Sequence, residues 1–98
     1  RHRRIGTGEL NRFFREVVER HPPTLFKGKR ARLYFVTQPL VRPPTFVFSA
    51  RDPDAVSDSY ARYLRNVLRE RFGFAGTPLW LKFRPRNKNA GKDSKSLD

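Results

Sequence analysis

Five segments of this chain carry apolar residues on one side only, and this pattern limits the folds that the chain can adopt. The first segment is helical, because its apolar positions follow the spacing i, i+3, i+4, i+7 and i+8 of one helix face. We expect Thr7 to cap a helix from about Gly8 to Arg20, and His21-Pro22-Pro23 to end it, since proline has no backbone donor. The apolar stripe is formed by Leu10, Phe13, Phe14, Val17 and Val18.

Two strands are predicted next, separated by a proline-containing connection. Residues 32–37 alternate between two sides, as a strand with one buried face does. The prolines within residues 39–44 predict an irregular connection, and residues 45–49 form a second β-rich run that ends at a turn over residues 52–54. We expect the two runs to pair antiparallel. On the first strand one side carries Leu33 and Phe35, and the other carries Arg32, Tyr34 and Val36.

A second helix and a third strand complete the pattern. Ser57 or Asp58 is expected to cap the helix, which runs to about Phe72 and is stopped by Gly73. Its apolar positions, again at helical spacing, are Tyr60, Leu64, Val67, Leu68 and Phe72. In the third strand Leu79, Leu81 and Phe83 alternate with Trp80, Lys82 and Arg84.

The predicted elements follow the order α-β-β-α-β. Because each element has a single apolar side to bury, we expect an α+β fold in which two helices cover one face of a three-stranded sheet. Residues 7–84 are expected to form this domain, residues 1–6 a basic linker from a preceding domain, and residues 85–98 a disordered basic tail. The phenylalanines expected in the core are Phe13, Phe14, Phe35, Phe72 and Phe83.

Composition excludes several classes of function. The 98 residues carry a net charge of +13, and a hydrophobic content of 37% places that charge on a folded surface. Without cysteine there is no disulfide and no thiolate zinc site, and only His2 and His21 supply imidazole. The carboxylates have no partner at catalytic spacing, so we expect neither catalysis nor a metal. No apolar run approaches the roughly 18 residues of a membrane span, so we expect a cytoplasmic protein. We also expect a monomer.

Several short runs along the chain resemble one known family. They are Thr7-Gly8-Glu9-Leu10-Asn11-Arg12, Thr37-Gln38, Pro43-Pro44-Thr45-Phe46-Val47, Asp52-Pro53, Tyr60 with Arg62-Tyr63-Leu64, Leu68-Arg69-Glu70 and Phe72-Gly73-Phe74-Ala75-Gly76-Thr77-Pro78. Together, and in this order, they resemble the C-terminal domain of the EngA GTPases, also called Der. The resemblance implies a KH-like domain that follows two tandem GTP-binding domains, in a bacterial protein that associates with the large ribosomal subunit during its assembly.

The chain departs from the expected motifs in two ways. It has no G-x-x-x-x-G-K-[ST] loop, so GTP and Mg²⁺ are expected in the GTP-binding domains and no cofactor in this one. A KH domain usually clamps nucleic acid with a G-x-x-G loop, but residues 52–58 contain no glycine and three carboxylates. Gly73-Phe74-Ala75-Gly76 spells the motif elsewhere, where a helix stop and a turn explain both glycines.

Basic side chains form groups that predict contact with RNA. One group falls at i, i+3 and i+7 on the polar side of the second helix, where it can meet successive phosphates. The alternative for the helix group is an ordinary solvated face, and the alternative for the group before the first strand is a flexible loop whose charges serve solubility. The candidate RNA-binding residues are Lys27, Lys29, Arg30 and Arg32, then Arg62, Arg65 and Arg69 on the helix, and Lys82 and Arg84 on the third strand.

Tyr34 and Trp80 are expected on the sheet face that the helices leave open, where exposed aromatic rings either stack RNA bases or dock a neighbouring domain. We favour docking, with Pro43 and Pro44 as further anchors. Two functions follow from the sequence. The leading one is a non-catalytic module that binds rRNA of the large ribosomal subunit, and the alternative is a regulatory domain that docks on the GTP-binding domains. A generic polyanion-binding domain is a third interpretation.

Overall fold

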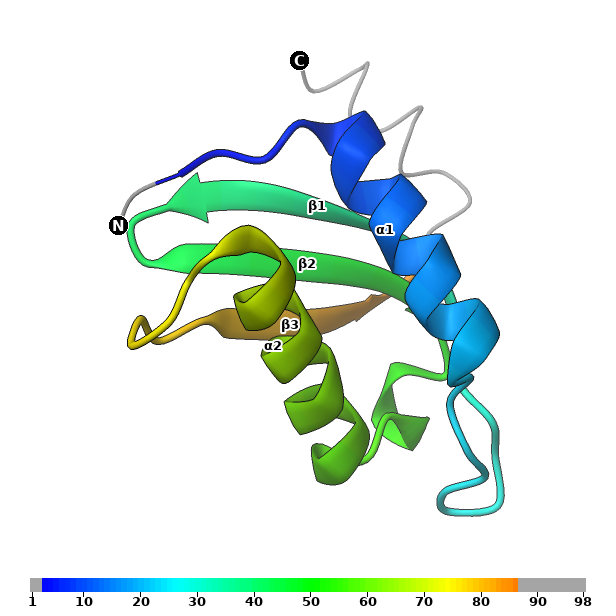
Figure 1. The fold of residues 1–98 in the computed structure, drawn as a ribbon. Helices are drawn as coiled ribbons and strands as arrows, with labels where there is room; N and C mark the ends of the chain where they lie inside the picture. The colour runs from blue at the N-terminus through cyan, green and yellow to red at the C-terminus, as the bar shows by residue number, and fades with distance from the viewer. Residues whose placement is uncertain (1–2, 87–98) are drawn as a thin grey trace.

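Two helices and three strands make up the fold of residues 3–86, the part of the chain that the computed structural model describes (Figure 1). The elements are α1 (Thr7–Arg20), β1 (Arg32–Val41), β2 (Pro44–Arg51), the short 3₁₀ helix η1 (Pro53–Ala55), α2 (Asp58–Phe72) and β3 (Trp80–Pro85). The predicted order α-β-β-α-β and the α+β class are confirmed. Residues 1–2 of the predicted linker and 87–98 of the predicted tail lie outside the described residues.

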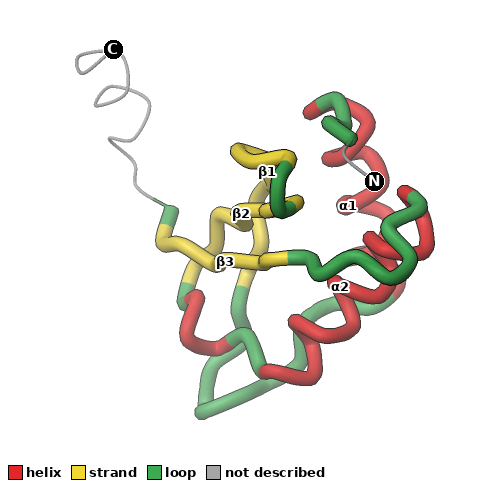
Figure 2. The backbone as a smooth tube through the Cα atoms, turned by 90° about the vertical axis from the view of Figure 1, so that its left-hand side faces the viewer, coloured by secondary structure: helices red, strands yellow, loops and turns green. Residues whose placement is uncertain are grey.

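The sheet has the strand order β1-β2-β3 and is mixed. β1 and β2 pair antiparallel, as predicted, and β2 and β3 pair parallel. Figure 2 shows the sheet in one layer and both helices in a second layer on the same side of it. One face of the sheet is therefore covered by α1 and α2, and we call the other the open face.

The core lies between the helices and the covered face. Its centre is β2, where Phe46, Phe48 and Ala50 are each 1% exposed or less. The ring of Phe48 packs edge-on against Phe14 of α1 and stacks on Phe83 of β3, at centroid distances of 5.3 and 5.0 Å. Burial of each such ring contributes about 1.5–3 kcal/mol. The middle strand thus joins both neighbouring elements into one core.

The caps of α2 agree with the sequence, but the start of α1 does not. Ser57 Oγ accepts a hydrogen bond from the Tyr60 amide at 3.1 Å, and Gly73 ends α2 with a φ of 77°. The prediction that Thr7 caps α1 is wrong, because Thr7 is already helical and Gly6 is the N-cap. The reason is that the Gly6 carbonyl accepts the first helical bond, from the Leu10 amide at 2.9 Å.

β1 differs most from its prediction. It continues through Pro39 to Val41, and its pairing with β2 shifts twice, between Leu33 and Phe35 and between Thr37 and Leu40. Proline is tolerated there because it lies on an edge strand at an irregular point of the ladder.

The first shift overturns the expected burial of Phe35. Leu33 and Val36 both belong to the core, although they are three residues apart and a regular strand buries every second residue. A β-bulge at Tyr34 inserts one extra residue into β1 relative to β2, so that Leu33 and Val36 can both face the core. Phe35 is consequently 47% exposed on the open face, and the prediction that it lies in the core is wrong.

Two buried side-chain amides cover the outer edge of β1. Asn11 of α1 bonds both backbone groups of Val36: its Oδ1 accepts from the Val36 amide at 2.9 Å and its Nδ2 donates to the carbonyl at 2.8 Å. Gln38 of β1 binds the segment that precedes α1. Its Oε1 accepts from the Ile5 amide at 2.8 Å, and its Nε2 donates to the Arg3 carbonyl at 2.9 Å. Ile5 is buried in the core, so residues 3–6 pack along β1.

We expect Asn11→Ala to lower the free energy of unfolding by at least about 2 kcal/mol, because it leaves two buried backbone groups without partners. Urea denaturation measures this loss. Arg12→Ala, at the exposed neighbouring position, is the control. Equal losses in the two variants would contradict the role of Asn11.

Candidate nucleic-acid interface

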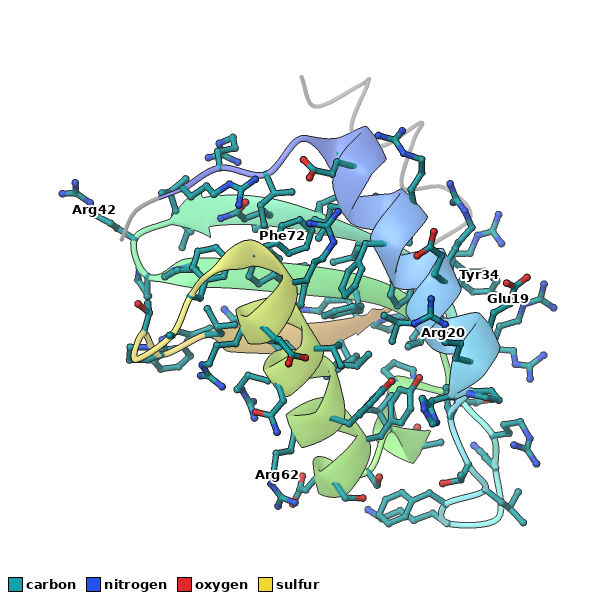
Figure 3. All side chains as sticks on the ribbon, viewed as in Figure 1. Glu19, Arg20, Tyr34, Arg42, Arg62 and Phe72 are labelled. Carbon is teal, nitrogen blue, oxygen red and sulfur yellow. The ribbon has the colours of Figure 1, made fainter. Side chains whose placement is uncertain are left out.

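The arginines of α2 divide into one that projects from the fold and two that hold a loop. Arg62 is exposed and points away from the rest of the fold (Figure 3). Arg65 donates through Nε to the Leu79 carbonyl at 3.2 Å, and Arg69 donates through Nη2 to the Thr77 carbonyl at 3.1 Å. Arg65 and Arg69, both predicted to bind RNA, therefore hold the connection from α2 to β3 in place. Of the three arginines, only Arg62 projects away from the fold.

The basic loop between α1 and β1 ends in a tight turn that extends beyond α1 (Figure 1). The backbone groups of Phe26 and Lys29 bond each other at 2.7 and 3.1 Å. Lys27 and Gly28 between them have φ values of 56° and 74°, which is typical of a type I′ turn. The turn holds Lys27 and Lys29 at an exposed tip.

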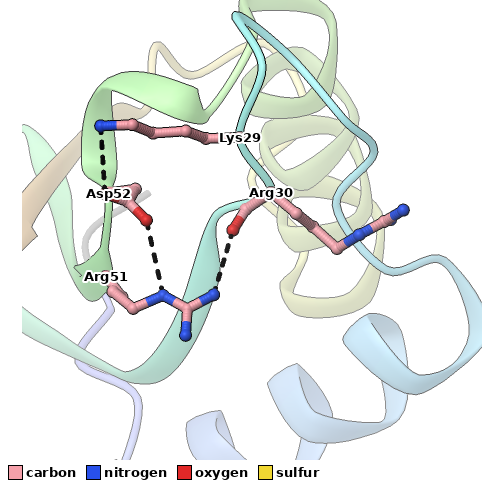
Figure 4. Close-up of polar contacts among 4 residues, drawn as sticks. All are labelled: Lys29, Arg30, Arg51 and Asp52. Carbon is pink, nitrogen blue, oxygen red and sulfur yellow. Dashed lines mark hydrogen bonds and ion pairs between the residues drawn. The ribbon is translucent and has the colours of Figure 1, made fainter.

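Where this loop meets the end of β2, Asp52 forms ion pairs with Lys29 of the loop and Arg51 of the strand (Figure 4). Asp52 lies between Lys29 and Arg51, with oxygen-to-nitrogen distances of 3.6 Å to Lys29 Nζ and 3.4 Å to Arg51 Nε. Arg51 also donates through Nη2 to the Arg30 carbonyl at 3.5 Å. Arg30 in turn donates to the Pro23 carbonyl at 2.8 Å. The guanidinium of Arg51 is thereby held at the end of the sheet.

The open face is arranged in rows that cross the three strands. Residues opposite one another in the pairing register point to the same face. Phe35, Ser49 and Arg84 form one row, and Thr37, Val47 and Lys82 the next. Leu40, Thr45 and Trp80 form the last row. The alternation predicted for β3 is confirmed, since Trp80, Lys82 and Arg84 are exposed between the partly buried Leu81 and Phe83.

The two aromatic residues predicted on the open face lie at opposite ends of the sheet. Trp80 is 56% exposed, and Leu40 in the same row is 52% exposed. Pro43 is exposed in the turn that follows β1, whereas Pro44 is fully buried and out of reach of a partner. We call Leu40, Pro43 and Trp80 the apolar end of the open face.

Tyr34 is surrounded by arginines at the other end. The Cζ atoms of Arg32 and Arg86 lie 5.6 and 4.5 Å from the centre of its ring, within cation–π range. The Arg86 amide donates to the Ala50 carbonyl at 3.0 Å, which holds this arginine beside the sheet. We call the following group the arginine end: Arg32, Tyr34, Phe35, Arg51, Arg84 and Arg86.

Sequence reasoning misses three members of the arginine end. Simple alternation places Phe35 in the core, because it does not reveal a bulge. Arg51 stands just after the predicted second strand, and Arg86 falls in the predicted tail. One sequence feature points to this surface: Tyr34 and Phe35 are adjacent aromatic residues in a strand that contains no acidic residue.

Tyr60 is a structural group near the end of α1. Its hydroxyl donates to the His21 carbonyl at 2.7 Å, and burial, with a smaller effect of Tyr63, raises its pKa to about 12. It therefore stays protonated at neutral pH and donates to the end of the helix.

Among residues 3–86 there is no group of three His, Asp or Glu side chains that could hold a metal ion. Within the same range, neither helix has the length and apolar character needed to cross a membrane.

The α-β-β-α-β order and the one-sided helix layer are those of a KH-like domain. A family model agrees over residues 4–84: it describes the KH-domain-like C-terminal part of EngA bacterial GTPase enzymes. The chain belongs to this family. It matches the C-terminal KH-like domain, a non-catalytic module, rather than a GTP-binding domain.

Curated relatives carry the same family name. The chain is 53% identical to GTPase Der of Thermomicrobium roseum over 90 residues, which are 92% of this chain and 20% of that protein. It is also 53% identical to GTPase Der of Chloroflexus aggregans, over 90% of this chain and 20% of the relative. GTPase Der of Moorella thermoacetica is 51% identical over 84% of this chain and 19% of the relative. The chain thus spans about one fifth of the length of these relatives.

Proposed function

We propose that this chain is the RNA-binding module of a ribosome-assembly GTPase, which contacts rRNA of the large ribosomal subunit and couples that contact to GTP-binding domains in the same polypeptide. One observation carries the proposal. The three strands contain no Asp or Glu, whereas they supply Arg32, Arg51, Lys82 and Arg84. A sheet surface with cations and no carboxylates in its strands attracts a polyanion where those cations gather.

The mechanism is electrostatic. Each Lys or Arg that meets a phosphate releases counterions from the RNA, so the affinity depends steeply on salt and only weakly on base sequence. Lys82 and Arg84 are well placed for this contact, because they are exposed on the open face. Arg62 is also exposed, but it lies on α2 in the helix layer and would meet RNA from the other side of the domain. Arg65 and Arg69 support the contact on the open face by holding the loop before β3.

Family membership supports the wider setting of the proposal. The relatives are GTPases of which this chain covers about one fifth, so GTP and Mg²⁺ would be held outside this domain. We place the protein in the bacterial cytoplasm, where the large subunit is assembled, and this domain acts there as a monomer.

Replacing Lys82 and Arg84 with glutamine should weaken binding to an rRNA fragment and to a scrambled RNA alike. The slope of log affinity against log salt should fall by about 0.7–0.9 for each phosphate that is no longer neutralised. Fluorescence anisotropy at several salt concentrations measures both quantities. Arg12→Gln, which removes an exposed arginine from α1, is the matched control. An unchanged salt slope, or the same change in the Arg12 variant, would contradict the assignment.

A second function, docking on the GTP-binding domains, is favoured by the apolar end of the open face. Leu40 and Trp80 are both more than half exposed and lie across Thr45 from each other. Exposed apolar side chains gathered beside polar ones are typical of a surface that packs against another protein domain. This contact leaves the cations at the arginine end free for RNA.

Trp80 is the only tryptophan of the chain, so its fluorescence reports docking directly. We expect its emission to shift to the blue when the GTP-binding domains are added, and not when the rRNA fragment is added. Leu40→Ser should weaken docking by about 1 kcal/mol or more, because less apolar surface is buried against the partner. Leu25→Ser is the control, since Leu25 is 64% exposed in the loop before β1. A response of Trp80 to RNA alone would refute the docking function.

A further inference from the structure

The arginine end has the composition of a site for nucleotide bases as well as for phosphates. The bulge in β1 places the half-buried Tyr34 next to the exposed Phe35, its neighbour in the chain. Tyr34 lies between two hollows. One, of about 550 Å³, is lined by Ala50, Arg51, Asp52, Pro85 and Arg86. The other, of about 570 Å³, reaches α1, and its charged lining residues include Arg15, Glu19 and Arg32. Tyr34 and Arg51 line both hollows, which together we call the recess.

Contacts within the domain orient two cations of this recess, Arg51 and Arg86. Asp52 and the Arg30 carbonyl fix the guanidinium of Arg51 (Figure 4). Arg86 is held by its backbone bond to β2 and by the Tyr34 ring. Arg84 stands in the same row as Phe35, separated from it by the small Ser49. Groups that are already ordered lose less entropy on binding.

We infer that the arginine end binds unpaired nucleotides of an RNA single strand or loop, with a base stacked on the Tyr34–Phe35 surface and the adjoining phosphates paired with Arg51 and Arg86. Aromatic rings and guanidinium planes both stack bases, and the π-face that they use is hidden within a duplex. An acidic protein segment would use the cations but neither the exposed ring of Phe35 nor the half-buried ring of Tyr34. This inference rests on the proposed function, because it names the part of an RNA that this domain recognises.

The inferred site also replaces a missing motif. The stretch that would carry the G-x-x-G clamp, residues 52–58, contains η1 and three carboxylates instead. Asp52 of that stretch orients Arg51 toward the recess. The domain would therefore take RNA on its open sheet face, in the manner in which aromatic side chains of a sheet stack bases.

The test compares two fluorescein-labelled probes: a seven-nucleotide RNA without secondary structure and a blunt RNA duplex of the same length. Tyr34→Leu with Phe35→Leu should lower affinity for the single strand by about tenfold or more, because stacking is removed. It should leave duplex binding and the salt slope unchanged, because no charge is removed. Tyr34→Phe, which keeps the ring, should bind as the unmodified chain does, and Trp80→Leu is the matched aromatic control at the apolar end.

Arg86→Gln gives a second measurement that does not depend on the folding of the double variant. It should weaken single-strand binding and lower the salt slope by about 0.7, the value for one phosphate of a single strand. Equal losses of single-strand and duplex binding in the double variant would overturn the inference. So would unchanged affinity in that variant, or competition by polyglutamate as strong as that by the single strand. If the unmodified chain bound neither RNA, the proposed function itself would fail.

Discussion

The hydrogen bonds between Asn11 and the backbone of Val36 are the interaction on which the rest of the structure depends. They fasten α1 to the outer edge of β1 and leave the Val36 side chain in the core. Since Leu33 is also buried, the strand must gain one residue between them, and it does so at Tyr34. The same interaction that closes the edge of the sheet thus places Phe35 on the open face. An exposed aromatic ring at that position is a consequence of how the core is built.

The one-sided helix layer separates the charges of the domain. Acidic residues of the helices pair with cations there: Glu9 lies 3.9 Å from Arg71, and Glu16 lies 4.0 Å from Arg20. These exposed pairs add little stability. The strand sequences themselves contain no Asp or Glu. The open face consequently keeps its positive charge. Its two ends differ, because one carries Leu40 and Trp80 and the other carries arginines around Tyr34. RNA contact and domain docking can therefore occur on one face without sharing residues.

Much of the fold is predictable because its signals are local. The Ser57 cap, the Gly73 stop and the alternation of β3 depend on neighbouring residues, and the structure confirms each of them. The bulge at Tyr34 depends on contacts between α1 and β1 that are distant in the chain, so alternation misplaces Phe35. Thr7 is misplaced by one residue, because the Gly6 carbonyl already accepts the first helical bond from Leu10. The candidate site is less predictable than the fold, since a sequence identifies which residues are charged but not what those charges contact. Arg65 and Arg69 look equivalent to Arg62, yet they donate to backbone carbonyls of the loop before β3.

The central claim is that the open face meets two different partners at its two ends. Backbone amide chemical shifts of the isotope-labelled chain test it most directly, with the rRNA fragment and the GTP-binding domains added in separate titrations. We predict that RNA shifts the amides of Arg32, Phe35 and Arg84, and that the protein domains shift those of Leu40 and Trp80. The account would be contradicted if both partners shifted the same set of amides, or if neither set lay on the sheet.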